Sequence, residues 1–537
     1  MVWLDEEFTR RQVIRAGAAG GLALSAGGAL AGCLGGDDDD DDGGGATSPQ
    51  AQAGDFRRGG TLRVGATGGG AEDTVDGHKP TSDPDIMRTW QLFEPLAVRN
   101  AAFTELEMVL AESLEAEANK ADLWTVRLKP DLEFHNGKTV TADDVIFSLK
   151  RILDPKDPKV GAASIGYIDA KGLKKMDART VRIPLKFANS TFPEDIGQYF
   201  NNIVPTDFDP KNPVGTGAFK YKSLSPGEQS TFVRHPNYWR KGEPYVDELV
   251  INDFTEPTAK VNALVGGQVE AINNVPFGQL SSIQGNNNLR AVISETGSWQ
   301  PFTMRVDAAP FDDNRVRQAF RLLVDREQMV QQVLSGQGRI ANDLYAPYDD
   351  CYADDLPQRE QDLDKAKSLL KQAGQSDLRV ELVTGDIFRG VVEAAQVFAE
   401  QAKGAGVQVK VRKVDTGTFY GDNYLSWPFA QDFWSTRTYL TQVAQGSLPD
   451  SPFNETHWDN KEFQKLIRQA RGELDDDKRC DLLHEAQRLE YEEGGHIIPY
   501  FSNAIDAHSS KIGGIQEAKS GFTLGNYQLR SVGFLKS

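Results

Sequence analysis

The chain is poor in the side chains that most often build metal and redox sites. Its 537 residues include only three cysteines and seven histidines, and no two histidines stand at metal-ligand spacing. We therefore expect neither a directly bound metal nor a cofactor. Basic residues are also fewer than acidic ones. The 59 lysines and arginines and the 78 aspartates and glutamates give a formal net charge of −19. This charge excludes nucleic acid as a partner, since phosphate binding needs a basic face.

The motifs of secreted hydrolases are missing or broken. No Gly-x-Ser-x-Gly elbow occurs, and the nearest match, at residues 162–166, lacks the first glycine. Residues 484–488 open like a zinc-protease helix, but Arg488 occupies the position of the second histidine. The sequence therefore predicts no enzymatic activity.

Long apolar runs are absent except near the N-terminus. Residues 16–30 are rich in alanine and glycine and fall short of the about 20 apolar residues that span a membrane. They follow the paired arginines Arg10 and Arg11 and lead into the tetrapeptide LAGC that ends at Cys33. Such a segment is typical of an export signal, here of the twin-arginine route for folded proteins. The alternative is that this run is a membrane anchor.

The tetrapeptide LAGC resembles a lipobox, in which Cys33 receives a diacylglycerol and becomes the mature N-terminus. Two acyl chains are needed, because one holds a protein only marginally at a membrane. Residues 34–56 then contain six consecutive aspartates and several glycines without apolar periodicity, which predicts a disordered stalk. We expect a signal peptide over residues 1–33 and a protein that is lipid-anchored at the external face of the cell membrane.

Strand and helix patterns alternate beyond the stalk. The period-two segments predict strands at residues 60–65, 122–128, 181–185, 232–234, 248–251, 378–383 and 407–414. The helical periods lie at residues 141–154, 256–264, 314–334 with an interruption at Asp325, 364–373, 391–403, 461–471 and 477–492. The alternation after residue 364 favours an α/β fold. A chain of this length should also divide into more than one core.

Four blocks of sequence carry a family resemblance. The first covers residues 110–145 and includes the run FHNGK, and the others cover residues 212–239, 311–336 and 364–374. In this order the blocks resemble the family 5 extracellular solute-binding proteins of ABC importers, which include dipeptide, oligopeptide and nickel binders. The first block is the most specific of the four.

The resemblance implies an α/β, two-lobe periplasmic-binding-protein-like fold of type II, with an extra inserted subdomain and a ligand cleft between the lobes. The first lobe would comprise residues 57–298 and 505–537, with the inserted subdomain at about 100–205, and the second lobe residues 299–504. Solute would shift the lobes from open to closed, and the permease would recognise the closed state. The implied partners are a small solute and the permease and ATPase subunits, for a receptor that acts as a monomer.

The expected ligand residues gather between positions 420 and 437. In peptide-binding members an acidic residue of the second lobe pairs with the peptide's amino terminus, and Asp432 stands at the matching place. The family's Asp-Tyr-x-Asp-Pro continuation is replaced here by the run FWSTR. Arg437, which ends this run, either clamps a carboxylate or phosphate with its planar fork or forms a buried salt bridge with Asp432. The aromatic candidates for contact with ligand are Trp427, Trp434, Tyr420, Tyr424 and Trp299.

Peptides are the expected solute, and several alternatives stay open. The same fold suits an oligosaccharide, an opine or chelated nickel, and it also suits a sensory or chaperone-like receptor without transport. The acidic composition fits either a lipoprotein of haloarchaeal type or an ordinary acidic exported protein. Cys351 and Cys480 either pair in an oxidising exterior or stay apart, because spacing alone does not decide this.

Overall fold

The largest sheet has eight strands, drawn from both ends of the chain. The computed structural model describes residues 55–536. Its main sheet has the order β13-β20-β12-β2-β11-β10-β9, and β15 also pairs with β20. The strands are β2 (Thr61–Thr67), β9 (Phe219–Ser225), β10 (Gln229–Arg234), β11 (Glu248–Phe254), β12 (Ala271–Ile272), β13 (Leu289–Trp299), β15 (Gly338–Ile340) and β20 (Tyr500–Ser509). With helices α2 (Asp83–Leu92), α6 (Pro257–Val265) and α7 (Leu280–Gln284), this sheet forms what we call the first lobe.

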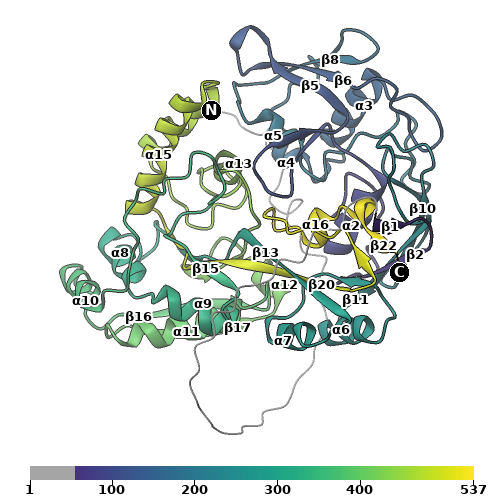
Figure 1. Ribbon diagram of the computed structural model, residues 1–537. Helices are drawn as coiled ribbons and strands as arrows, with labels where there is room; N and C mark the ends of the chain where they lie inside the picture. Colours follow the sequence, from purple (N-terminus) through teal and green to yellow (C-terminus); the bar gives the residue numbers. More distant parts are fainter. Residues whose placement is uncertain (1–54, 537) are drawn as a thin grey trace.

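A smaller sheet with its own core is inserted in this lobe and lies at the top of Figure 1. Its strand order is β5-β6-β8-β7. The elements are β5 (Ala111–Ala116), β6 (Leu123–Leu128), β7 (Lys174–Lys175), β8 (Thr180–Pro184), α3 (Ala142–Ile152), α4 (Ala162–Ile165) and α5 (Phe192–Ile196). Helix α3 begins where the sequence predicts, because the backbone N–H of Thr141 donates to the Asp144 carboxylate at 2.9 Å. Buried apolar residues of α3, such as Val145 and Leu149, pack in this core.

The second lobe follows β13 and is built around two further sheets. One has the order β18-β14-β19, and the other is the parallel pair β16-β17. The strands are β14 (Phe302–Met304), β16 (Arg379–Gly385), β17 (Gln408–Val414), β18 (Phe429–Gln431) and β19 (His496–Ile497). The helices are α8 (Asn314–Leu322), α9 (Arg326–Leu334), α10 (Leu363–Gln372), α11 (Val391–Lys403), α12 (Thr416–Phe419), α13 (Tyr439–Gly446), α14 (Lys461–Gly472) and α15 (Asp476–Glu493). A core rich in phenylalanine, including Phe302, Phe320, Phe398 and Phe429, holds these layers together.

Short elements complete the described chain. These are β1 (Phe56–Arg57), β3 (Ala97–Arg99), β4 (Leu106–Met108), β21 (Ile512–Gly513), β22 (Gly533–Leu535), α16 (Thr523–Asn526) and 3-10 turns at Glu117–Asn119, Phe277–Gln279 and Leu529–Ser531. The predicted helices and strands are confirmed, with ends that differ by a few residues. The interruption at Asp325 is confirmed as well, because its side chain caps α9 by accepting from the Gln328 N–H at 2.9 Å.

The chain passes between the lobes twice, at residues 300–301 and 498–499, and the two passages lie side by side. Strand β13 leads into β14, and β19 leads into β20. Trp299 at the end of β13 is paired with Phe501 of β20. Figure 1 shows the long strand β20 crossing the centre of the molecule.

The lobes also touch directly away from these passages. The Gly297 N–H of the first lobe donates to the Thr436 hydroxyl at 2.8 Å, and the Thr441 hydroxyl donates to the Asp195 carboxylate at 3.1 Å. Arg389 of the second lobe donates to the Asn274 side-chain oxygen at 2.9 Å. The structure is therefore that of a conformation in which the lobes are in contact.

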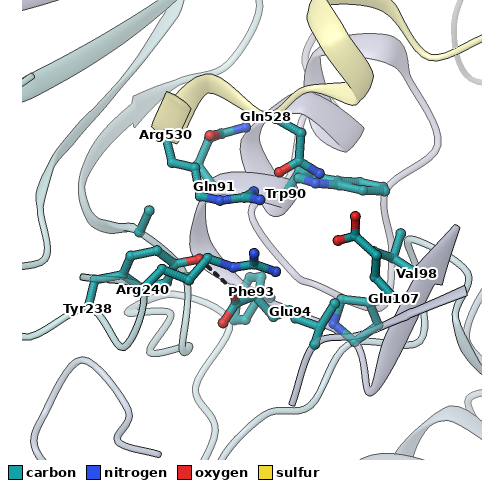
Figure 2. A pocket seen from close by; sticks show the side chains of 14 residues that line it. Trp90, Gln91, Phe93, Glu94, Val98, Glu107, Tyr238, Arg240, Gln528 and Arg530 are labelled. Carbon is teal, nitrogen blue, oxygen red and sulfur yellow. Dashed lines mark hydrogen bonds between the residues drawn. The ribbon is translucent and has the colours of Figure 1, made fainter. Parts of the chain in front are cut away.

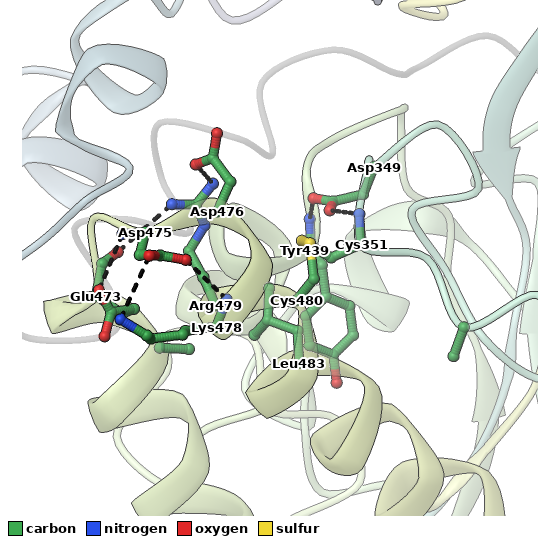
Figure 3. The surroundings of a disulfide bond; sticks show 12 residues. Asp349, Cys351, Tyr439, Glu473, Asp475, Asp476, Lys478, Arg479, Cys480 and Leu483 are labelled. Carbon is green, nitrogen blue, oxygen red and sulfur yellow. Dashed lines mark hydrogen bonds and ion pairs between the residues drawn. A yellow bond between two sulfur atoms is a disulfide. The ribbon is translucent and has the colours of Figure 1, made fainter.

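A disulfide between Cys351 and Cys480 settles the question that the spacing left open. It joins the loop after β15 to α15, with the two Cα atoms 4.7 Å apart. The neighbouring carboxylate of Asp349 accepts from the backbone N–H groups of Cys351 at 2.9 Å and of Tyr439 at 2.7 Å (Figure 3). The loop is thus attached to both α13 and α15.

The predicted signal peptide, Cys33 and nearly all of the predicted stalk lie outside the described residues. Within residues 55–536, no helix combines the length and apolarity that crossing a membrane requires.

Removal of the disulfide is expected to destabilise the second lobe by about 2–4 kcal/mol, because the bond closes a loop with a sequence separation of 129. Denaturant unfolding of a Cys351→Ser/Cys480→Ser variant measures this loss. Reduced wild type should unfold at the same denaturant concentration as the variant. Equal stability of the oxidised and reduced wild type would contradict the expectation.

Candidate functional site

Asp432 lies where the second lobe meets the first. It directly follows β18, which pairs with β14 just after the first passage between the lobes. Its backbone N–H donates to the Pro301 carbonyl at 3.3 Å. Two residues later, Trp434 and Trp299 exchange backbone hydrogen bonds of 2.9 and 3.0 Å. The predicted site is therefore attached to the end of β13.

The carboxylate of Asp432 is buried and occupied by hydrogen-bond donors. The residue is 5% exposed. One oxygen accepts from the Tyr420 hydroxyl and the Phe433 N–H, and the other accepts from the Tyr424 hydroxyl, each at 2.8 Å. Three of the predicted residues thus come together. The two tyrosine hydroxyls, which were expected to contact ligand, bond to Asp432 instead.

A second buried carboxyl group, that of Glu455, lies beside Asp432. Glu455 is 6% exposed, and neither of its oxygens has a hydrogen-bond partner within the described chain. Burial raises the pKa of Glu455 to about 8, and burial together with Glu455 raises the pKa of Asp432 well above its usual value. The closest basic group is His496 at 3.7 Å, and burial lowers its pKa to about 4, so that its ring is neutral. The two acids therefore retain a proton at neutral pH.

Sequence reasoning missed Glu455 as a member of the site. It lies in the loop between α13 and α14, without periodicity or a catalytic motif. Its neighbour Asn454 is buried and donates to the main-chain carbonyls of Leu448 and Trp458. Only the folded chain brings this loop next to Asp432.

Trp434 is the end ring of a column of four stacked aromatic rings. Trp434 stacks on Trp299 at 6.0 Å between ring centroids, Trp299 on Tyr345 at 5.2 Å, and Tyr345 on Tyr439 at 5.2 Å. Trp299 is 2% exposed and has both ring faces covered. Trp434, at the end of the column, is 8% exposed, and Arg437 lies over its ring.

Arg437 is the unpaired cation of the site. Its guanidinium carbon lies 5.2 Å from the centroid of the Trp434 ring, and one nitrogen donates to the Gln442 side-chain oxygen at 3.4 Å. The predicted alternative of a salt bridge between Arg437 and Asp432 is wrong. Residues 55–536 contain no ion pair to Arg437, and the Asp432 carboxylate bonds to Tyr420 and Tyr424. Burial lowers the pKa of Arg437, and the only opposing influence is the Tyr199 hydroxyl of the first lobe.

Trp427 packs with the two tyrosines that bond to Asp432. Its indole N–H donates to the Phe419 carbonyl at 3.3 Å, and its ring belongs to a small cluster that includes Val383, Tyr420 and Tyr424. Arg412 of β17 lies over the ring at 5.4 Å. The structure therefore groups Trp427 with the β16-β17 sheet and not with Arg437.

Further aromatic rings line the lobe boundary, and sequence reasoning did not select them. Phe433 stacks on Phe388 at 4.7 Å between centroids, and both rings are half-buried. From the first lobe, Tyr199 contacts Phe522 at 5.3 Å, and Phe522 in turn contacts Trp90 at 5.9 Å. No local signal marks these rings, because they come from loops far apart in the sequence.

A separate polar pocket lies in the first lobe (Figure 2). It is lined by Trp90, Gln91, Phe93, Glu94, Pro95, Val98, Glu107, Val109, Gly217, Ala218, Tyr238, Arg240, Gln528 and Arg530. Glu94 accepts from the Tyr238 hydroxyl at 2.7 Å and from the indole N–H of Trp239 at 2.8 Å, and Arg530 pairs with Glu243 at 2.8 Å. None of the predicted ligand residues lines this pocket.

The fold and the lobe boundary define a two-lobe binding protein of the periplasmic type. A family model confirms and narrows this class. The chain belongs to the bacterial extracellular solute-binding proteins of family 5, whose model matches residues 105–459, well over half of the chain. Members of this family are substrate-binding proteins of ABC importers and not enzymes.

Relatives and solved structures agree with this assignment. The di/tripeptide-binding protein 2 of Pseudomonas aeruginosa (strain UCBPP-PA14) is 26% identical over 75% of this chain and 82% of its own length. The oligopeptide-binding protein AppA of Bacillus subtilis (strain 168) is 27% identical over 79% and 83%. The periplasmic binding protein DppA of Helicobacter pylori, solved with the peptide STSA, has a TM-score of 0.75 and 20% identity over 89% of this chain and 99% of its own. This last similarity establishes the shared fold.

The acid pair predicts a pH-dependent stability. Because the folded-state pKa of Glu455 is raised from 4.5 to about 8, its stabilising contribution is present below pH 4.5 and is lost as the pH rises through 8. A Glu455→Gln variant cannot ionise there and should gain stability over wild type in this interval, by up to about 1.4 kcal/mol per pH unit. Denaturant unfolding at several pH values measures the difference.

Glu72→Gln is the matched control, because Glu72 is exposed. Its difference from wild type should not change over the same interval. A Glu455→Gln difference that is equally flat would show that Glu455 ionises normally in the folded protein.

Proposed function

We propose that this protein is a lipid-anchored receptor that captures peptides between its two lobes and delivers them to an ABC permease and its ATPase. The observation that carries the proposal is the half-buried guanidinium of Arg437, which lies over the ring of Trp434 and has no ion-pair partner among residues 55–536. A solute held between the lobes would remove water from this cation, and the terminal carboxylate of a peptide would supply the opposite charge. The relatives named for di/tripeptides and oligopeptides support peptides as the solute class.

The half-buried rings at the boundary suit a ligand of variable sequence. Phe388 and Phe433 of the second lobe and Tyr199 and Phe522 of the first offer apolar surface that does not depend on one side-chain chemistry. Contacts such as Thr441 to Asp195 join the lobes only when they meet. Solute that bridges the lobes would therefore shift the equilibrium towards the closed state.

We propose that the first lobe comprises about residues 57–299 and 500–537, with the inserted subdomain at about 100–205, and that the second lobe comprises about residues 300–499. The two passages at residues 300–301 and 498–499 and the separate apolar cores support this division, whose second boundary lies before β20 and not at residue 505 as the resemblance implies. The receptor would act as a monomer, because each chain carries both halves of its site.

Arg437→Gln is expected to lose the solute that co-purifies with the wild type. Mass spectrometry of molecules released by denaturation should find short peptides from wild type and at least about tenfold less from the variant, since truncating a buried charge pair costs more than about 2 kcal/mol. Arg412→Gln is the control, because Arg412 also lies over a tryptophan but pairs with Glu381. Release of a sugar or a metal chelate would overturn the peptide assignment.

Membrane attachment through Cys33 is a separate proposal. It is supported by the tetrapeptide LAGC after the twin-arginine signal. Cys33→Ser removes the thiol that accepts lipid, so that the exported protein should move from the membrane fraction into the medium, where immunoblotting of both fractions detects it. Replacement of Arg10 and Arg11 by lysine should instead retain the protein inside the cell. A Cys33→Ser protein that still sediments with membranes would argue for an uncleaved anchor at residues 16–30.

A further inference from the structure

We propose that this receptor selects its solute through a carboxylate held at Arg437 and that it needs no free amino group on the solute. N-acylated peptides would therefore bind as well as free ones. The inference rests on the proposed function, and it departs from the amino-terminal role that the family resemblance implies for Asp432.

An amino group of a ligand has little access to Asp432. A ligand ammonium would have to reach a carboxylate that already accepts from Tyr420, Tyr424 and the Phe433 N–H. All three donors belong to the same short segment as Asp432 and form part of the protein's own packing. An incoming ammonium would have to displace at least one of them from a residue that is 5% exposed.

The charge of the buried acid pair is reduced without a ligand. Asp432 and Glu455 are buried side by side, and the groups that face them are the hydroxyls of Tyr420 and Tyr424, the indole of Trp434 and the imidazole of His496. One proton retained by either carboxyl group removes half of the charge of the pair without any ligand. The two acids therefore do not need a cation from a ligand. The indole N–H of Trp434 lies next to Glu455 and has no other acceptor among the described residues.

Two buried arginines without an ion pair, Arg317 and Arg321, differ from the half-buried Arg437 in their hydrogen bonds. Arg317 donates to the Phe311 and Glu493 carbonyls, and Arg321 donates to the His496 and Gly494 carbonyls. Main-chain oxygens thus satisfy both guanidinium groups inside the fold. Arg437 has no such carbonyl, and its one hydrogen bond is the 3.4 Å contact with Gln442.

The Arg437 guanidinium therefore lacks an oxyanion partner, which a ligand could supply at the face of Trp434. One guanidinium balances one negative charge, which matches a carboxylate better than a phosphate with its charge near two. Tyr199 of the first lobe lies close enough to influence the charge of the same guanidinium. The ligand class is a carboxylate-terminated peptide or peptide-like molecule, whatever the state of its amino end.

The test uses the exported chain with Cys33→Ser, stripped of solute, and a random tripeptide library in four forms. These forms are free at both ends, N-acetylated, C-amidated, and blocked at both ends. Mass spectrometry quantifies the peptides that the protein retains after rapid gel filtration. We expect the free and N-acetylated pools to be retained equally within about threefold, and both amidated pools to fall by about 30-fold or more.

Variants separate the roles of the two sites. Arg437→Gln and Arg437→Lys should each abolish the difference between free and amidated pools, since lysine keeps the charge but lacks the planar fork. Asp432→Asn and Glu455→Gln should leave the ratio of free to N-acetylated peptides near one. Arg412→Gln should behave as the parent, and melting temperatures confirm that each variant is folded.

Two results would overturn the inference in distinguishable ways. Loss of retention on N-acetylation, restored to parity with the free pool by Asp432→Asn, would show that an amino group is read at Asp432, and the peptide proposal would stand. Retention of none of the four pools would overturn the peptide proposal itself and the inference with it.

Discussion

The antiparallel pairing of β13 with β20 is the constraint on which the rest of the structure depends. Both strands leave the first lobe at neighbouring positions, where Trp299 pairs with Phe501. The register shifts between Glu295 and Ser298, a local irregularity that bends and twists a strand just before it leaves the sheet. The lobes are thus joined through β13 and β20, with β15 paired to the other edge of β20 at the same level, and the predicted site is attached to β13 through the bonds between Trp299 and Trp434.

Charge is balanced unevenly along this boundary. The chain carries a large excess of acids, yet Asp432 and Glu455 are buried together without a charged cation, while the half-buried Arg437 nearby has no acid among residues 55–536. The aromatic ring of Trp434 lies between these two arrangements, with Glu455 near its N–H and Arg437 over its face. A retained proton reduces the charge of the two acids, whereas Arg437 has only the Trp434 ring and the Gln442 side chain as partners among residues 55–536.

Local patterns determine much of the fold and little of the site. Helix α11 has the predicted bounds of residues 391–403, and Asp325 is a cap in both sequence and structure. The grouping of Asp432 with Tyr420 and Tyr424 lies within one segment, but sequence could not tell that the tyrosines bond to the acid. Glu455, Phe388 and Tyr199 reach the boundary only through packing between distant elements, for which a single sequence carries no period or motif. The absence of a salt bridge between Asp432 and Arg437 in the described chain likewise could not be read from the sequence.

The column of Trp434, Trp299, Tyr345 and Tyr439 has an evolutionary consequence. Its four rings stack in one continuous row from Arg437 to α13, and the hydroxyls of Tyr345 and Tyr439 both donate to Glu490 at the inner end. A smaller residue at one place would leave a void that its neighbours cannot fill without shifting. Selection should therefore act on the four positions as a unit, so that ring sizes along the column covary in descendants of this chain even where the solute changes.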